Sequence, residues 1–172
     1  MTWILACLSG IIMMSYILWT SICYPPQISL SRTYFVIPWK PLFTLVMMVS
    51  GFLMLPRTLD IVPGEFKLIP FLGIGCMILV GCAPNLEDEA ERKVHVVGAI
   101  GSAIFSQLWI VLYTNVWITL ILWLAPLGIL GYVLMREKPG NLRELDIKLD
   151  RYRTTFWTEL VCYVILYIGL LL

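Results

Sequence analysis

The chain has 172 residues, of which 60% are apolar and 13% are charged, and its formal net charge is +1. This composition excludes a water-soluble globular domain, in which about a quarter of the residues are charged. The near balance of charges also gives no basic surface for nucleic acid, so we expect no nucleic-acid partner.

Apolar runs occupy most of the sequence, and six of them approach the roughly 20 residues that a membrane-crossing helix needs. They are Trp3–Tyr24, Pro38–Leu55, Phe66–Cys82, Val94–Tyr113, Val116–Leu134 and Thr155–Leu172. The first run is too long for a secretory signal and lacks its charged start, so we expect a retained helix. The sequence predicts an all-α polytopic membrane bundle of six transmembrane helices, with residues 1–172 forming a single integral membrane domain.

The first predicted loop gathers polar side chains between two apolar runs. It begins after Tyr24, where Pro25 and Pro26 end the first helix. It contains Ser29, Ser31, Arg32 and Tyr34. Serines satisfy exposed backbone groups in such turns, and they also act as nucleophiles when a base is adjacent.

The second run begins with Pro38 and Pro41, which the first turn of a helix tolerates. We expect this helix to stop near Pro56 and the segment "PRTLDIVPGEF" to form a tight turn. Farther along, Thr114 and Asn115 alone separate the fourth and fifth runs, which predicts a tight helical hairpin.

Small residues recur in the third and fourth runs. They are Gly73, Gly75 and Gly81, followed by Gly98, Ser102 and Ser106 at intervals of four. In lipid, small residues at this spacing allow two helix backbones to approach closely. We expect these faces to be helix contacts, and the Gly98, Ser102 and Ser106 face to be available for a homo-oligomer.

The last loop has the pattern of an amphipathic helix. In "GNLRELDIKLDRYRTTF" apolar residues recur every three or four positions with charges between them, and Asn141 followed by Glu144 resembles a capping box. We expect one interfacial helix lying on the inner membrane surface, where lipid anchoring is the simpler role and partner binding the alternative.

Lys and Arg are distributed unevenly over the two sides that alternating spans define. One side carries Arg32, Lys40, Arg92, Lys93, Arg136, Lys138, Arg143, Lys148, Arg151 and Arg153, and the other only Arg57 and Lys67. By the positive-inside rule the ten-residue side is cytoplasmic, which places the N-terminus and the C-terminus outside.

This topology brings several polar groups to the cytoplasmic side. The first loop, Asn85, the acidic segment Glu87–Glu91 and His95 all fall there, so we expect Ser29, Ser31, Tyr34 and His95 to converge. We expect Arg32 to face lipid phosphate or the acidic segment. Glu159 lies a few residues into the sixth run, where an ionisable group is costly; it either reaches the interface beside Tyr152 or Arg153 or pairs with Gln107 inside the bundle.

The segments "ISLSRTYF" and "CAPNLEDEAERKVHVVGAIGSAIF" together resemble a group of uncharacterised bacterial six-helix membrane proteins. Those proteins carry a Ser-Ile-Ser-x-Tyr-Tyr-like loop after the first helix and a histidine opening the fourth. They are distant relatives of the superfamily of alkaline ceramidases and adiponectin receptors. The resemblance covers roughly residues 25 to 110 and implies a bacterial inner membrane as the location.

The positions that match this motif are Ser29, Ser31, Tyr34 and His95, and those that depart from it are Arg32, the inserted Thr33 and Phe35. The ceramidase-like enzymes hold a zinc with three histidines, near a serine and an aspartate. This chain has one histidine, whereas a catalytic zinc usually needs three protein ligands. The resemblance therefore implies a fold more than an activity, and we expect no metal and no cofactor.

The five cysteines lie in or beside apolar runs with no CxxC pair, so we expect free thiols and no disulfide. The candidate ligand-binding residues are Ser29, Ser31, Arg32, Tyr34, His95 and Glu159, and no residue is assigned as catalytic. The preferred hypothesis is a small membrane protein that binds a lipid or a membrane partner at a polar cytoplasmic mouth. The alternatives are a membrane-embedded lipid amide or ester hydrolase and, less favoured because the spans carry so few charges, a small transporter.

Overall fold

The computed structural model describes residues 1–114 and 117–172, and the side chains of all these residues except 117–119 and 143. This part of the chain contains helices and no strand. Its long helices are α1 (Thr2–Cys23), α3 (Pro41–Ile61), α4 (Leu68–Cys82), α5 (Glu89–Tyr113) and α8 (Thr154–Leu171). Shorter elements are α2 (Thr33–Val36), η1 (Gly64–Phe66), η2 (Trp117–Trp123), α6 (Leu124–Tyr132), η3 (Val133–Glu137) and α7 (Leu142–Arg151).

In the described part of the chain, six helical segments are long and apolar enough to cross a membrane. They are Thr2–Cys23, Pro41–Ile61, Gly64–Cys82, Glu89–Tyr113, Leu120–Glu137 and Thr154–Leu171. The protein is therefore an all-α polytopic membrane bundle, which confirms the fold class that the sequence predicts. The predicted hairpin depends on Asn115, which lies outside the described residues.

The boundaries of the second and fourth spans differ from the sequence prediction for reasons that the structure shows. The second span does not stop near Pro56, because α3 continues through that proline to Ile61. Continuing the helix keeps the neighbouring backbone groups paired inside the chain, which in lipid outweighs the one hydrogen bond that proline removes. This span also begins at Pro41 rather than Pro38, because the first loop contains the short helix α2. The fourth span starts earlier than predicted, at Glu89, because the Asp88 side chain caps it by accepting a hydrogen bond from the Glu91 amide.

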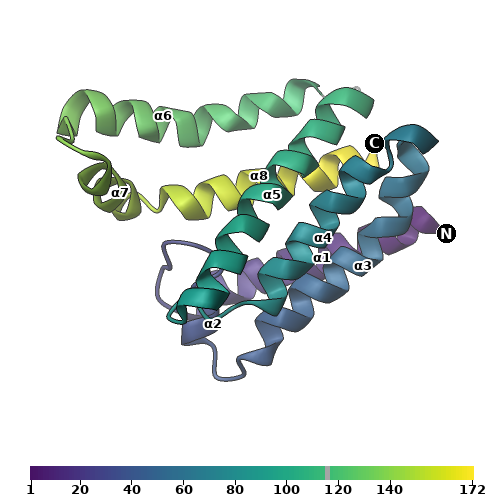
Figure 1. Cartoon of the computed structure of the whole chain (residues 1–172), viewed down its shortest axis with the longest axis horizontal. Helices are drawn as coiled ribbons and strands as arrows, with labels where there is room; N and C mark the ends of the chain where they lie inside the picture. Colours follow the sequence, from purple (N-terminus) through teal and green to yellow (C-terminus); the bar gives the residue numbers. More distant parts are fainter. Residues whose placement is uncertain (115–116) are drawn as a thin grey trace.

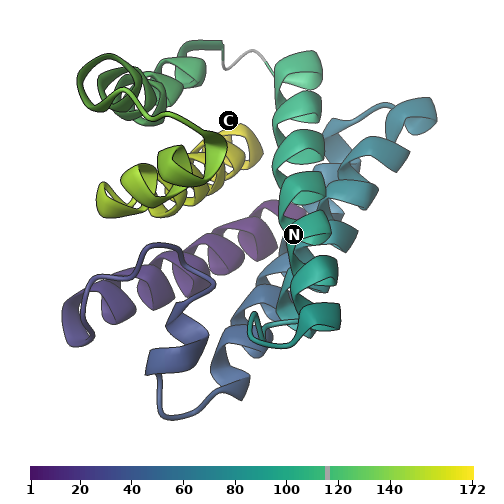
Figure 2. The ribbon, with the colours of Figure 1, turned by 60° about the vertical axis from the view of Figure 1, so that its left-hand side comes forward.

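The helices pack as two connected groups (Figure 1). α3 lies between α1 and α4, and α4 packs along α5. α8 contacts α1, α3 and α5, and it also packs against α6 and α7. Figure 2 shows α5 between the α3–α4 side and the α6–α8 side, so the face of α5 opposite α4 is directed at α8.

The α4–α5 pair explains part of the small-residue pattern. A Cβ atom added at Gly98 would lie 2.9 Å from the Cys76 carbonyl oxygen, so the two backbones approach too closely for a larger residue. Ser106 is buried, and its amide lies against Gly73. Gly98 and Ser106 thus make their close contacts within this chain.

The two ends of the bundle hold different groups. Trp3 donates from Nε1 to the Leu171 carbonyl (3.3 Å), so the N- and C-termini lie at the same end. Arg57 also bonds there, donating to the Leu170 carbonyl. The opposite end holds the first loop, α2, the start of α5 and α7, and it is there that the candidate site residues lie (Figure 1).

Candidate functional site

The first loop is fastened to the start of α8. The bonds run from Arg153 Nε to the Gln27 carbonyl (2.7 Å), from the Phe156 amide to the Ile28 carbonyl (2.9 Å) and from the Leu30 amide to Glu159 Oε2 (2.6 Å). Backbone groups near a membrane must find partners within the protein, and the first turns of α8 supply them. The first loop is therefore held in place against the bundle by hydrogen bonds to α8.

Ser31 and His95 form the central contact of this end. Ser31 Oγ lies 2.7 Å from His95 Nε2, and His95 Nδ1 lies 2.9 Å from the Ala83 carbonyl oxygen. A carbonyl can only accept, so Nδ1 carries the proton of the neutral ring and the Ser31 hydroxyl donates to Nε2. Both residues are buried, with 6% and 4% exposure, and the Phe43 ring stacks on the imidazole with centroids 6.4 Å apart.

Ser29 and Thr33 shape the loop around this contact. Ser29 Oγ accepts from the Arg32 amide (3.3 Å), which closes a local turn. Thr33 donates its hydroxyl to the Leu30 carbonyl and accepts a hydrogen bond from the Tyr16 hydroxyl, so α1 also holds the loop. Thr33 is an insertion relative to the motif that the first loop resembles, and Tyr16 was not among the predicted site residues. A tyrosine in the interior of an apolar span was the available signal, because its hydroxyl needs a partner.

Tyr34 and Arg32 lie apart from the Ser31–His95 contact. The Tyr34 ring packs edge-on against Phe35 and lies 5.4 Å from Lys40 Nζ, and within the described residues its hydroxyl makes no hydrogen bond to Ser31 or His95. Arg32 is exposed.

The charge of Arg32 acts on a carboxyl of α7. The pKa of Asp150 is raised, first by burial and then by Asp146, and Arg32 opposes that rise. In the acidic segment, Asp88 caps α5 and Glu91 accepts from the Asn85 amide.

Glu159 lines a cavity of about 340 Å³ between α5 and α8. Its Oε2 accepts from the Leu30 amide, whereas its predicted partner Gln107 bonds elsewhere. Gln107 donates to the Cys162 carbonyl (3.4 Å) and accepts from Trp123 Nε1 (3.3 Å). Glu159 is therefore paired with the first loop.

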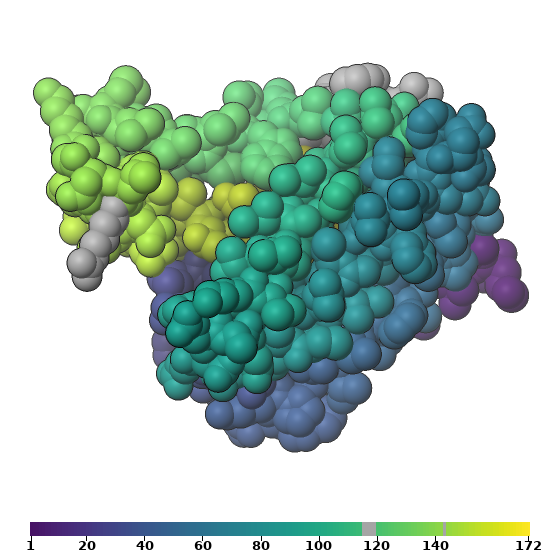
Figure 3. Space-filling model, viewed as in Figure 1, coloured from purple at the N-terminus to yellow at the C-terminus, as the bar shows by residue number. Residues whose placement is uncertain are grey.

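The cavity is lined by both apolar and polar side chains. Its apolar lining is Leu30, Phe43, Met47, Val80, Ala99, Ile100, Ala103, Leu149, Cys162 and Leu166. Its polar lining is Ser31, Ser102, Ser106, Asp146, Thr154, Thr155, Thr158, Glu159 and Tyr163. Ile100, which is 55% exposed, and Asp146, which is also exposed, are on its rim, so the cavity reaches the protein surface. In Figure 3 atoms of α8 are visible between α5 and α6 on this face.

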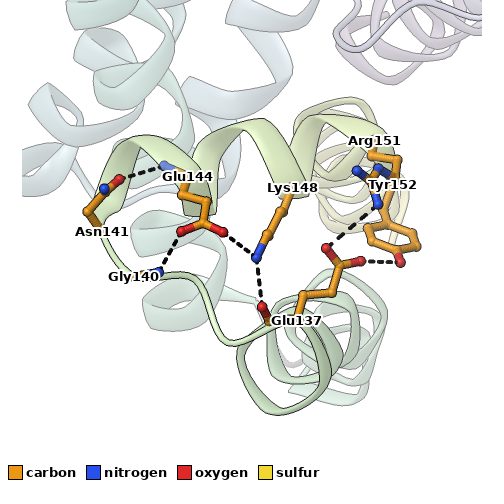
Figure 4. Close-up of polar contacts among 7 residues, drawn as sticks. All are labelled: Glu137, Gly140, Asn141, Glu144, Lys148, Arg151 and Tyr152. Carbon is orange, nitrogen blue, oxygen red and sulfur yellow. Dashed lines mark hydrogen bonds and ion pairs between the residues drawn. The ribbon is translucent and has the colours of Figure 1, made fainter.

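Helix α7 borders the cavity through Asp146 and Leu149. It confirms the predicted amphipathic helix and its Asn141 cap, whose Oδ1 accepts from the Glu144 amide (2.8 Å). The Glu144 carboxylate accepts a hydrogen bond from the Gly140 amide, whereas in a capping box it would accept from the Asn141 amide. It also forms an ion pair with Lys148 (Figure 4). These two contacts, Lys148 first, hold the pKa of Glu144 below its ordinary value.

Glu137 fastens the other end of α7. It accepts from the Tyr152 hydroxyl (2.6 Å), raising the pKa of Tyr152 to about 12, and it pairs with Arg151 at 3.8 Å (Figure 4). Lys138 and Arg153, which flank the helix, have φ of 43° and 54°, and such left-handed positions interrupt a helix. α7 is thus a separate segment between two sharp bends, and polar contacts attach it to the chain on either side.

Comparisons with known proteins add no relatives. A search of protein-family models found no match, and searches of the curated proteins and of the solved structures found none either.

Two kinds of chemistry are available at this end of the bundle. A cavity that combines apolar side chains with hydroxyl and carboxyl groups suits an amphiphile. The Ser31 hydroxyl, bonded to an imidazole whose other nitrogen is held by a carbonyl, has the geometry of a nucleophile beside a base. Among the described residues no group of three or more His, Cys, Asp or Glu side chains is placed to hold a metal ion.

Proposed function

We propose that this protein binds a single-chain lipid or similar amphiphile in the α5–α8 cavity, with its polar end at Ser31 and Glu159. The observation that carries the proposal is the cavity itself, which combines apolar lining residues with hydroxyl and carboxyl groups and reaches the protein surface. Its volume of about 340 Å³ is near the lower limit of small-molecule sites, roughly 300–1,000 Å³. That size favours one aliphatic chain over a two-chain phospholipid.

We propose further that the polar end of the cavity faces the cytoplasm and that the protein resides in a bacterial inner membrane, with both termini outside. The ten-to-two distribution of Lys and Arg supports this orientation. The Trp3–Leu171 contact, which joins the two termini, is compatible with it.

Filling the cavity tests the binding proposal. Ala103 lines the cavity from α5, whereas Ala125 is exposed on α6. Native mass spectrometry of the purified wild-type protein should detect a bound amphiphile, which lipid extraction then identifies. Ala103→Phe should lower its occupancy at least tenfold and Ala125→Phe should leave it unchanged. A wild-type protein free of amphiphile, or equal occupancy in the Ala103→Phe variant, refutes the proposal.

A second candidate function is hydrolysis of an ester or amide of the bound lipid, and the Ser31–His95 geometry favours it. Ser31 Oγ would attack the carbonyl carbon while His95 Nε2 takes the hydroxyl proton and passes it to the leaving alkoxide or amine. Water would then attack the acyl-serine, releasing the acid and restoring Ser31. The 2.7 Å contact and the lining position of Ser31 support this step.

A fluorophosphonate probe separates this activity from simple binding, because it reacts covalently with an activated serine. Intact mass measurement should show one adduct on the wild-type protein and none on Ser31→Ala. His95→Gln should slow adduct formation at least a hundredfold, and Ser29→Ala should react normally. A wild-type protein that stays unmodified refutes hydrolysis and leaves lipid binding intact.

A further inference from the structure

We infer that the cavity selects an amphiphile whose polar end is a positively charged amine and discriminates against carboxylate and phosphate ends. This inference rests on the proposed lipid binding and adds the chemistry of the head group. It follows from the charges that border the cavity and from the contacts of Glu159.

The charged side chains of the lining are both acidic. Asp146 stands at the exposed rim and Glu159 lies deeper, and the described lining includes no Lys, Arg or His. Charges interact much more strongly in a medium of low dielectric constant than in water. An anionic head group placed between these carboxylates would be repelled, and a cationic one would be attracted.

Glu159 has an oxygen left for such a ligand. Its Oε2 is held by the Leu30 amide at 2.6 Å. In the described part of the chain, Oε1 makes no hydrogen bond or ion pair. A carboxylate inside a membrane bundle is costly unless it is paired, and a ligand ammonium group would supply the missing cation.

Two arginines at this end of the bundle, Arg153 and Arg32, do not line the cavity. Arg153 donates from Nε to the Gln27 carbonyl, and its guanidinium lies 4.2 Å from the centroid of the Phe156 ring. Arg32 is exposed at the protein surface. Neither arginine therefore occupies the place of the ligand's charge.

The neighbouring hydroxyls fit the same head group. An ammonium group has three N–H donors and no acceptor. Ser102 on α5 and Thr155 and Thr158 on α8 line the cavity together with Glu159 and offer hydroxyl oxygens as acceptors. A carboxylate and several hydroxyls in the same cavity are the complement of a primary amine.

Two probes with the same chain test the inference. Dodecylamine and dodecanoic acid are titrated against the purified protein in nonionic detergent at pH 8, where the amine is protonated and the acid ionised; dodecanol is the neutral reference. Native mass spectrometry should show dodecylamine bound at least tenfold more tightly than dodecanoic acid. Glu159→Gln keeps an acceptor for the Leu30 amide but removes the charge, so it should reduce this ratio to about one.

Asp60→Asn is the control, because Asp60 bonds Thr2 at the opposite end of the bundle and should not affect the ratio. Asp146→Asn at the exposed rim should partly reduce the ratio of amine to acid affinity. This variant tests the inference if Glu159→Gln does not fold. Equal binding of the amine and the acid by the wild-type protein refutes charge selection but leaves lipid binding standing. Failure of all three probes to bind, dodecanol included, refutes both.

Discussion

At the end of the bundle that holds the first loop, individual hydroxyl groups connect separate segments of the chain. Thr33 is the clearest case. Its side chain donates to the Leu30 carbonyl and accepts from the Tyr16 hydroxyl, so it joins the first loop to α1. Thr33→Val keeps the shape but leaves the buried Tyr16 hydroxyl without this partner, which should lower the free energy of unfolding by about 1–3 kcal/mol.

The measurement is thermal unfolding in detergent. Thr33→Ser retains the hydroxyl and should stay close to the wild type. Combining Thr33→Val with Tyr16→Phe should recover part of the loss, because no polar atom is then left unpaired. Equal loss in the single and double variants would show that the Tyr16 hydroxyl does not matter.

At this scale sequence reasoning could place residues at one end of the bundle but could not pair them. Topology predicted that Ser31 and His95 share an end, and the structure brings them into hydrogen-bond contact. The same reasoning grouped Tyr34 with them, yet its ring lies against Phe35. A short loop offers several directions for each side chain, and only the three-dimensional path of the loop selects among them.

At the scale of helices, the contact between α4 and α5 depends on Gly98. A methyl group there would lie 2.9 Å from the Cys76 carbonyl oxygen, which is backbone and can move only with its helix. Gly98→Ala should therefore destabilise the protein by about 1–3 kcal/mol.

Gly75 provides the matched control, because an added Cβ there meets nothing within 4 Å. Gly75→Ala should be neutral or stabilising by up to about 1 kcal/mol, since alanine favours helix. Thermal unfolding of both variants in the same detergent compares them. Equal effects would mean that close backbone approach at Gly98 is unimportant.

The attachment of α7 should depend on pH through Glu144. Its pKa is lowered from 4.5 by Lys148 and by the Gly140 amide, so the charged form is stabilised in the folded protein. The resulting stabilisation is present above pH 4.5 and is lost as pH falls through the lowered pKa. Asp150 acts in the opposite sense, because its raised pKa means that its charge weakens the fold as pH rises.

Hydrogen exchange of residues 140–148, corrected for the intrinsic effect of pH, measures this attachment. Protection should fall below pH 4.5 in the wild type. In Glu144→Gln it should be lower at neutral pH and change little with acid. A wild-type segment whose protection is constant from pH 7 to pH 3 would contradict the role of Glu144.

The sequence predicted the helices well where composition alone determines them. Long apolar runs and the period of α7 identified those elements, because both signals are local. Pro56 and α2 were misjudged for opposite reasons. The surrounding lipid favours continuing α3 through its proline, and tertiary hydrogen bonds to α8 and α1 fold a loop that local signals leave undefined.

At the scale of the whole molecule, the free cysteines allow the proposed orientation to be measured. Cys23 and Cys82 are exposed at the ends of α1 and α4, at the end of the bundle that holds the first loop. Thr2, beside Asp60, marks the opposite end.

In single-cysteine variants, a membrane-impermeant maleimide should leave Cys23 and Cys82 unmodified in intact cells and label both in inverted vesicles. Thr2→Cys should show the reverse pattern, because the proposed orientation, based on the ten-to-two excess of Lys and Arg, places the first-loop end inside. Labelling of Cys23 and Cys82 from outside would invert the topology, and labelling of Cys23 and Thr2→Cys from the same side would refute α1 as a membrane-crossing helix.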